Sequence, residues 1–188
     1  MVQGNLKILF AGPTGAGKTT AVSAVCDGPV VSTNESATDM TRDLKPKTTV
    51  ALDFGIAALG GLEPIHVYGA PGQERFSFMW DILTQGGSGL ILLADASRPR
   101  PIDDMIFYLK TFEDYICESS KLAIGITRSD VTTGPGIAEY RSALHQLDLD
   151  PPIMKIDARN KQDVTKLMMA LMASMSPILV RKQAEPAF

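Results

Sequence analysis

The segment "GPTGAGKT", Gly12 to Thr19, constrains the fold more than any other part of the chain. It matches the pattern G-x-x-x-x-G-K-S/T, in which glycines let backbone N–H groups turn inward around phosphate oxygens. The apolar stretch "KILFA" precedes this loop and the helix-forming stretch "KTTAVSAVC" follows it. The phosphates would then lie at a helix N-terminus, where the helix dipole favours negative charge. Because a chance glycine-rich turn rarely has both flanking elements, the segment predicts a nucleotide-binding α/β fold.

The loop combines backbone donors with two side chains of distinct chemistry. Lys18 supplies a point charge for the β- and γ-phosphates, and the hydroxyl of Thr19 is a ligand for Mg²⁺. The predicted nucleotide-binding residues of this segment are Gly12, Thr14, Gly15, Ala16, Gly17, Lys18, Thr19 and Thr20.

Short apolar runs alternate with amphipathic helical patterns along the chain, which is typical of an α/β fold with a mostly parallel sheet. Six strands are expected, in "LKILFAG", "VALDFGIAAL", "PIHVYGA", "GLILLADAS", "LAIGITR" and "PIMKIDA". Helices are expected to flank the sheet and to begin near Lys18, Glu74, Ile102, Ile137 and Lys161. A chain of 188 residues suits one domain, so we predict a single domain over residues 1–188 with its core at about 6–180.

Two of these helices show the apolar spacing of a buried stripe. In the third helix the stripe comprises Ile102, Ile106, Leu109, Phe112 and Ile116, which predicts one continuous helix. In the last helix it comprises Val164, Leu167, Met168, Leu171, Met172 and Met175. Core packing is the favoured interpretation of these methionines, over an adaptable binding stripe.

Composition narrows the class of partner and compartment. The net charge of −3 argues against nucleic acid as the main partner, because phosphate backbones attract an excess of Lys and Arg. Two cysteines, Cys26 and Cys117, are too few for a disulfide framework and fit a reducing compartment. The sequence shows no secretory pattern, membrane-spanning stretch or lipid-anchor motif, so we expect a cytoplasmic protein without an intrinsic membrane anchor.

Four further motifs stand at strand ends or helix starts: "KTTVALDFG", "APGQERF", "TRSD" and "DAR". In this order they resemble the Ras-like small GTPases, from about Leu6 to Val180. More closely, "YGAPGQERFSFMWDIL" and "ITRSD" are similar to prokaryotic members, the MglA-like and conservon-type small G proteins. The resemblance implies a Ras-like G domain of the P-loop NTPase class and a bacterial signalling protein that binds GTP or GDP with Mg²⁺.

The resemblance also implies roles for residues that sense the γ-phosphate. Thr49 would be the first-switch threonine that reaches Mg²⁺ and the γ-phosphate, with Thr48 as an adjacent rival. The N–H of Gly72 would contact the γ-phosphate, and Gln73 would be the catalytic residue that orients the attacking water.

The guanine site implied by the resemblance involves two loops. Asp130 would accept hydrogen bonds from the ring N–H and exocyclic amine of guanine, and Ala158 would offer its N–H to the guanine carbonyl. The predicted base-binding residues are Thr127, Arg128, Asp130, Ala158 and Arg159. Thr127 and Arg128 replace the Asn and Lys usual in the family. Because adenine offers no matching donors to Asp130, guanine is the predicted base.

Gly69 is the departure from the family that bears most on the metal. It replaces an aspartate that holds an Mg²⁺-bound water, and losing such an outer contact typically weakens metal affinity about 10–100-fold. Asp53 is interpreted as structural, although it could compensate if the strand register placed it near the ion. Asp95 imitates the aspartate of a Walker B strand, but a loop-fixing role is favoured.

The residues that would assist catalysis are less defined. Thr14 occupies a position where Ras has a glycine needed for assisted hydrolysis, which leaves the rate open. Arg42 and Arg75 could each stabilise developing phosphate charge, although solvated surface charge is the favoured interpretation for both.

The segment after Gln73 is too apolar for one buried stripe, with Phe76, Phe78, Met79, Trp80, Ile82 and Leu83. We expect part of it to form a contact surface that responds to the γ-phosphate, and the resemblance implies a small roadblock-type regulatory partner. The leading hypothesis is a small GTPase that hydrolyses GTP slowly and depends on a partner for faster hydrolysis. The alternatives are an ATP-dependent phosphotransferase that uses Asp95 for Mg²⁺, and a nucleotide-bound interaction module without hydrolysis.

Overall fold

The computed structural model describes residues 6–32, 52–61, 63–119 and 122–175, and within them the chain forms one seven-stranded sheet. Its strand order is β2-β3-β4-β1-β5-β6-β7. The strands are β1 (Lys7–Ala11), β2 (Val31–Ser32), β3 (Asp53–Ala57), β4 (Ile65–Gly69), β5 (Gly89–Asp95), β6 (Leu122–Thr127) and β7 (Ile153–Lys155). β3 runs antiparallel to both of its neighbours, and every other pair is parallel.

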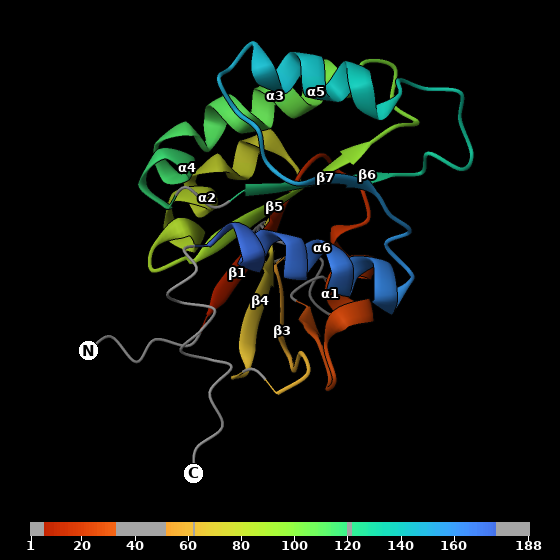
Figure 1. The fold of residues 1–188 in the computed structure, drawn as a ribbon. Helices are drawn as coiled ribbons and strands as arrows, with labels where there is room; N and C mark the ends of the chain where they lie inside the picture. The colour runs from red at the N-terminus through yellow and green to blue at the C-terminus, as the bar shows by residue number, and fades with distance from the viewer. Residues whose placement is uncertain (1–5, 33–51, 62, 120–121, 176–188) are drawn as a thin grey trace, which may run out of the picture.

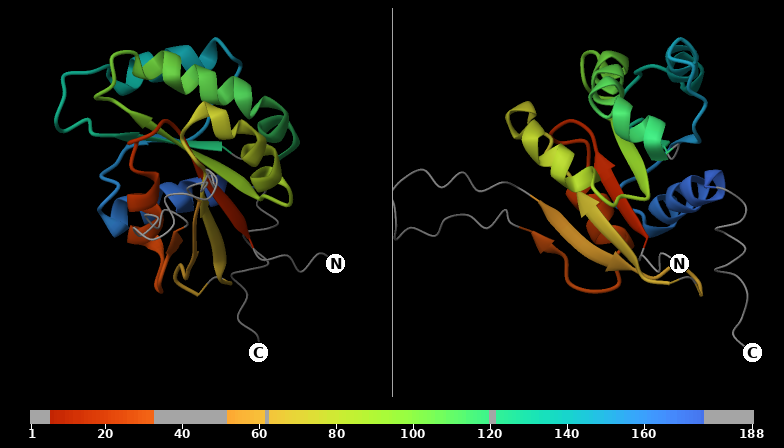
Figure 2. Two further views of the ribbon diagram at one scale, coloured as in Figure 1. Left: turned by 180° about the vertical axis from the view of Figure 1, so that it is seen from behind. Right: turned by 90° about the vertical axis from the view of Figure 1, so that its left-hand side faces the viewer.

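Helices cover both faces of this sheet, as Figure 1 and the side view in Figure 2 show. α1 (Lys18–Val25) and α6 (Lys161–Ser174) pack together on one face. α2 (Ser77–Thr84), α3 (Pro101–Thr111), α4 (Glu113–Ser119) and α5 (Ile137–His145) lie on the other. Each face has its own cluster of buried apolar side chains, so the sheet separates two hydrophobic cores.

The central strands explain why the site lies where it does. β5 and β6 are buried along their whole length, as expected for parallel strands covered on both faces. The parallel strands β4, β1, β5 and β6 are neighbours in the sheet, so their carboxyl ends meet at one edge. In open α/β sheets ligands bind outside this edge. The glycine-rich loop follows β1 there.

All six expected strands and all five expected helix starts are present, with three differences. A seventh strand, the two-residue β2, was not predicted because it is too short to show a pattern. The predicted single helix through Ile116 is wrong, since α3 ends at Thr111 and α4 begins at Glu113. The chain after Gln73 first makes a 3₁₀ turn, Glu74–Phe76, before α2 begins.

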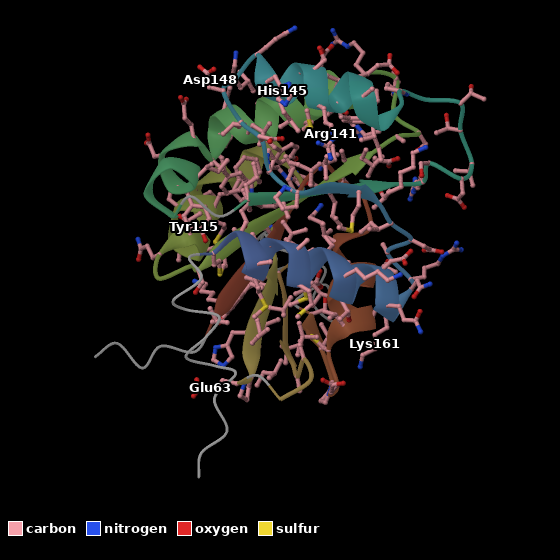
Figure 3. All side chains as sticks on the ribbon, viewed as in Figure 1. Glu63, Tyr115, Arg141, His145, Asp148 and Lys161 are labelled. Atoms are coloured by element: carbon pink, nitrogen blue, oxygen red, sulfur yellow. The ribbon has the colours of Figure 1, made fainter. Side chains whose placement is uncertain are left out.

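α6 confirms the core interpretation of the methionines. Met168, Met172 and Met175 are all buried in the hydrophobic core between α1, α6 and the sheet, whereas Met169 is 47% exposed. At the start of this helix, Lys161, labelled in Figure 3, donates from Nζ to Oδ1 of Asp27 at 2.6 Å. That ion pair links α6 to the loop after α1.

Candidate nucleotide-binding site

The glycine-rich loop has the backbone of a phosphate cradle. Gly12, Gly15 and Gly17 have φ angles of 134°, 85° and 94°, which side-chain-bearing residues rarely adopt. A Cβ on Gly12 would lie 2.3 Å from the carbonyl oxygen of Leu93, and one on Gly17 would lie 2.9 Å from the Cβ of Ala158. Conformation and close packing therefore both require glycine at the two ends of the loop.

Lys18 is the charged group at the centre of this loop. Its Nζ donates to the carbonyl oxygens of Gly12 and Pro13, both at 2.8 Å, and the side chain is buried. Burial lowers the pKa of Lys18 to about 8, and the nearby Asp53 carboxylate offsets this only in part. A buried cation with so little compensating charge is suited to receive an anion.

A cavity of about 380 Å³ opens beside the loop, and three segments far apart in the sequence line it. The glycine-rich loop and α1 contribute Ala16, Gly17 and Thr20. The end of β6 and the segment after it contribute Thr127, Arg128, Asp130 and Val131. The segment after β7 contributes Asp157, Ala158 and Arg159, and Ser97 also lines the cavity. All five residues predicted to bind the base therefore line one cavity. The volume suits a planar ring with its sugar.

Thr127 and Arg128, the two departures from the family pattern, both have structural contacts. The buried hydroxyl of Thr127 donates to the carbonyl of Ala16 at 3.1 Å, which ties β6 to the glycine-rich loop. Arg128 has a left-handed backbone with φ of 56°, and its guanidinium lies 3.4 Å from Oδ2 of Asp95. Asp95 also accepts hydrogen bonds from the N–H and hydroxyl of Ser97. These contacts agree with a loop-fixing role for Asp95.

Asp157 is a lining residue that sequence reasoning missed. Its carboxylate accepts hydrogen bonds from Nε and Nη2 of Arg159 and from the backbone N–H of the same residue. Those bonds lower the pKa of Asp157. The pair holds the loop that presents Ala158, and its place beside Ala158 in "DAR" was the available signal.

A second cavity, of about 190 Å³, lies at the other end of the loop. Its lining includes Thr14, Gly15, Lys18, Thr19, Asp53, Ala70, Pro71, Gly72, Gln73 and Phe76. The predicted catalytic residue, Gln73, therefore shares a cavity with the lysine and threonine of the cradle. The glycine-rich loop lines both cavities. Ala16 and Gly17 line the first cavity, and Thr14 and Gly15 line the second.

Asp53 stands where the missing carboxylate would be needed. β3 pairs with β4 so that Asp53 lies opposite Gly69, and a Cβ on Gly69 would meet Oδ2 of Asp53 at 3.0 Å. That Oδ2 accepts a 2.6 Å hydrogen bond from the hydroxyl of Thr19. The other oxygen, Oδ1, is buried and has no hydrogen-bond partner among the described residues. The neighbouring strand thus supplies a carboxylate in the space that Gly69 leaves open.

Three residues named from the sequence lie outside the described residues: Thr48, Thr49 and Arg42. Arg75 is described, and its guanidinium lies 4.8 Å from the centroid of the Phe76 ring. Within the described ranges, no group of three or more His, Cys, Asp or Glu side chains is placed to hold a metal ion. A hydroxyl, one carboxylate and phosphate oxygens are, however, the donor set that Mg²⁺ takes in nucleotide sites. Among the same residues, no helix is both long enough and apolar enough to cross a membrane.

A mostly parallel seven-stranded sheet, six α-helices in the described part of the chain, and a phosphate cradle after β1 define the class: this is the fold of a Ras-like P-loop G domain. No protein-family model matches the chain. It is 23% identical over 185 residues to the GTP-binding protein YPTM2 of Zea mays, covering 96% of this chain and 83% of the relative.

Two further relatives are similar to shorter parts of the chain. The chain is 26% identical over 139 residues to the Ras-related protein Rab-12 of Mus musculus, covering 72% of this chain and 52% of the relative. It is 28% identical over 99 residues to the uncharacterized protein MJ1339 of Methanocaldococcus jannaschii, covering 52% of this chain and 56% of that protein. The chain thus spans most of the maize protein but about half of the Rab-12 length. These similarities support a place in the Ras-like superfamily and a small GTPase in general.

Proposed function

We propose that the chain is a small GTP-binding protein that binds GTP or GDP with Mg²⁺ and hydrolyses GTP slowly. One observation carries this proposal: the glycine-rich loop, Asp130 and Ala158 line one cavity, although they lie far apart in the sequence. Asp130 would accept hydrogen bonds there, and guanine, unlike adenine, has both a ring N–H and an exocyclic amine to donate. The contacts of Asp95 with Ser97 and Arg128 favour this proposal over an ATP-dependent phosphotransferase.

The residues present fit a magnesium site. Thr19 would hold the ion through its hydroxyl, and Asp53, whose buried Oδ1 has no hydrogen-bond partner among the described residues, would accept from water around the ion. When bound, Mg²⁺ neutralises charge on the β- and γ-phosphates. Lys18 would add a positive charge in the same cavity as Thr19 and Asp53, and Gln73, which also lines it, would orient the attacking water.

We place the regulatory surface on α2. Phe76, Trp80 and Leu83 are buried, whereas Phe78 and Ile82, one helical turn apart, are each 56% exposed. Because only the 3₁₀ turn Glu74–Phe76 separates Gln73 from α2, movement of the switch loop would reach this apolar pair. The prokaryotic MglA-like resemblance suggests a roadblock-type signalling partner, and isothermal titration of Ile82→Asp against such a partner tests the surface. Undiminished binding by this variant would exclude it.

Single-turnover hydrolysis with a Gln73→Leu variant tests the catalytic part of the proposal. We expect the rate to fall at least about 10-fold, because the attacking water loses the group that orients it. GTP affinity should stay within about 2-fold, because the exposed Gln73 side chain carries no part of the cradle. An unchanged rate would remove Gln73 from catalysis. Tight GTP binding with no hydrolysis by the parent protein would favour the interaction module.

A further inference from the structure

The loop that follows β4 lies directly against the phosphate cradle. A Cβ on Gly72 would lie 2.6 Å from Nζ of Lys18 and 2.7 Å from the backbone N of Thr14. With a carbon–carbon bond of about 1.5 Å, the Cα of Gly72 lies within about 4.2 Å of both nitrogens. Lys18 and the loop amides are the groups that receive the terminal phosphates of a nucleotide. Residue 72 therefore fills room that a third phosphate needs.

Two buried side chains hold the loop in this position. The hydroxyl of Tyr108, on α3, donates to the carbonyl oxygen of Gly72 at 2.8 Å. Nε1 of Trp80, on α2, donates to the carbonyl oxygen of Pro71 at 2.8 Å. The rings of Trp80 and Tyr108 pack against each other with centroids 5.4 Å apart, and the ring of Phe112 also packs against Trp80, with centroids 5.5 Å apart.

These hydrogen bonds have different consequences for the nucleotide. α3 packs on β5, a strand that is buried along its whole length next to the central strand β1, so Tyr108 holds Gly72 from an element of the core. α2 belongs to the same stretch of chain as the loop, and Trp80 lies only nine positions from Pro71. A hydrogen bond from a rigid helix to the carbonyl of Gly72 stabilises the inward position of the loop, in which the cradle has no room for a third phosphate.

We infer that Tyr108 is a specificity-determining residue, whose hydrogen bond to Gly72 sets the preference between nucleoside diphosphates and triphosphates. A triphosphate displaces Gly72 from Lys18 and Thr14 and breaks this bond, whereas a diphosphate leaves it in place. Tyr108 is thus a positioning residue that acts through the loop and touches no nucleotide. The inference rests on the proposed function, because it requires the cradle to bind phosphates.

A Tyr108→Phe variant tests this inference, since it removes one hydroxyl and keeps the packed ring. Affinities for GDP and for a non-hydrolysable GTP analogue are measured with Mg²⁺. We expect the affinity for the GTP analogue to rise about 2- to 10-fold relative to GDP, the range for the loss of one hydrogen bond. An unchanged ratio, with both nucleotides bound, would overturn the inference. Failure of the parent protein to bind either nucleotide would instead overturn the proposed function.

The matched control is Tyr115→Phe. Tyr115, labelled in Figure 3, is another buried tyrosine, and its hydroxyl has no hydrogen-bond partner among the described residues. This variant should leave the ratio unchanged. Trp80 gives a second readout because it is the single tryptophan of the chain and donates to the same loop. Its emission should change with the GTP analogue and not with GDP, and an identical response to both would contradict loop displacement.

Discussion

At the scale of single residues, Gly69 stands where the resemblance implies an aspartate, and the adjacent strand supplies a carboxylate to the same space. Asp53 occupies the space beside Gly69 and binds the hydroxyl of Thr19. A carboxylate on the neighbouring strand would keep negative charge beside a bound Mg²⁺, although the backbone that carries it differs. The weakening of the metal site that Gly69 alone would cause is therefore not expected.

An exchange of the two residues tests this arrangement. Asp53→Ala should weaken Mg²⁺-dependent GTP binding about 10–100-fold, the usual effect of losing a partner in the outer shell. Adding Gly69→Asp to Asp53→Ala should restore much of the affinity, because the new side chain enters the space that Asp53 vacates. Fluorescent GTP titrations with Mg²⁺ and with EDTA measure both. An equal loss under the two conditions would contradict a role in metal binding.

Sequence reasoning identified the types of residue in the site better than their contacts. The glycine-rich pattern predicts the backbone of the loop because conformation there depends on local residues, and Gly12, Gly15 and Gly17 all have the positive φ angles that such a loop uses. The contact of Asp53 with Thr19 depends on the register between β3 and β4, which no local pattern specifies. The bond of Tyr108 to Gly72 joins residues 36 positions apart and was equally invisible.

At the scale of elements, the local sequence pattern predicted which strands and helices exist better than it predicted where they begin and end. The buried strands β5 and β6 were predicted correctly because a short, continuous apolar run between turns is typical of a fully buried strand. The break between α3 and α4 was missed because Phe112, at the break, keeps the apolar spacing and is buried. The backbone changes direction at Phe112, and the spacing of apolar residues along the sequence carries no sign of that change.

The buried face of α6 gives a prediction with an internal control. Met168 is fully buried, and its neighbour Met169 is 47% exposed. Met168→Ala should lower the free energy of unfolding by about 2–4 kcal/mol, because it leaves a cavity in the core. Met169→Ala should change it by less than about 0.5 kcal/mol, since surface substitutions have small effects. Urea denaturation measures both, and equal losses would contradict the packing of α6 against the sheet.

At the scale of the whole molecule, one loop at the edge of the sheet, the glycine-rich loop, lines two cavities. The larger cavity carries the residues expected to select the base, and the smaller one carries those expected to meet the phosphates and the metal. Trp80 of α2 and Tyr108 of α3 donate hydrogen bonds to Pro71 and Gly72, which line the smaller cavity, so the phosphate end of a ligand would be the end that can change the surface of the protein. This division supports a protein that reports which nucleotide it holds.

Competition between nucleotides tests the central claim most directly. GTP, GDP and ATP are titrated against a bound fluorescent guanine nucleotide in the presence of Mg²⁺, with the parent protein and with Asp130→Ala. We predict that GTP and GDP compete at far lower concentrations than ATP. The variant should lose at least about 10-fold of this preference, because each hydrogen bond to the carboxylate is worth about 1.5–3 kcal/mol. Equal or tighter binding of ATP by the parent protein, or an unchanged preference in the variant, would contradict the account.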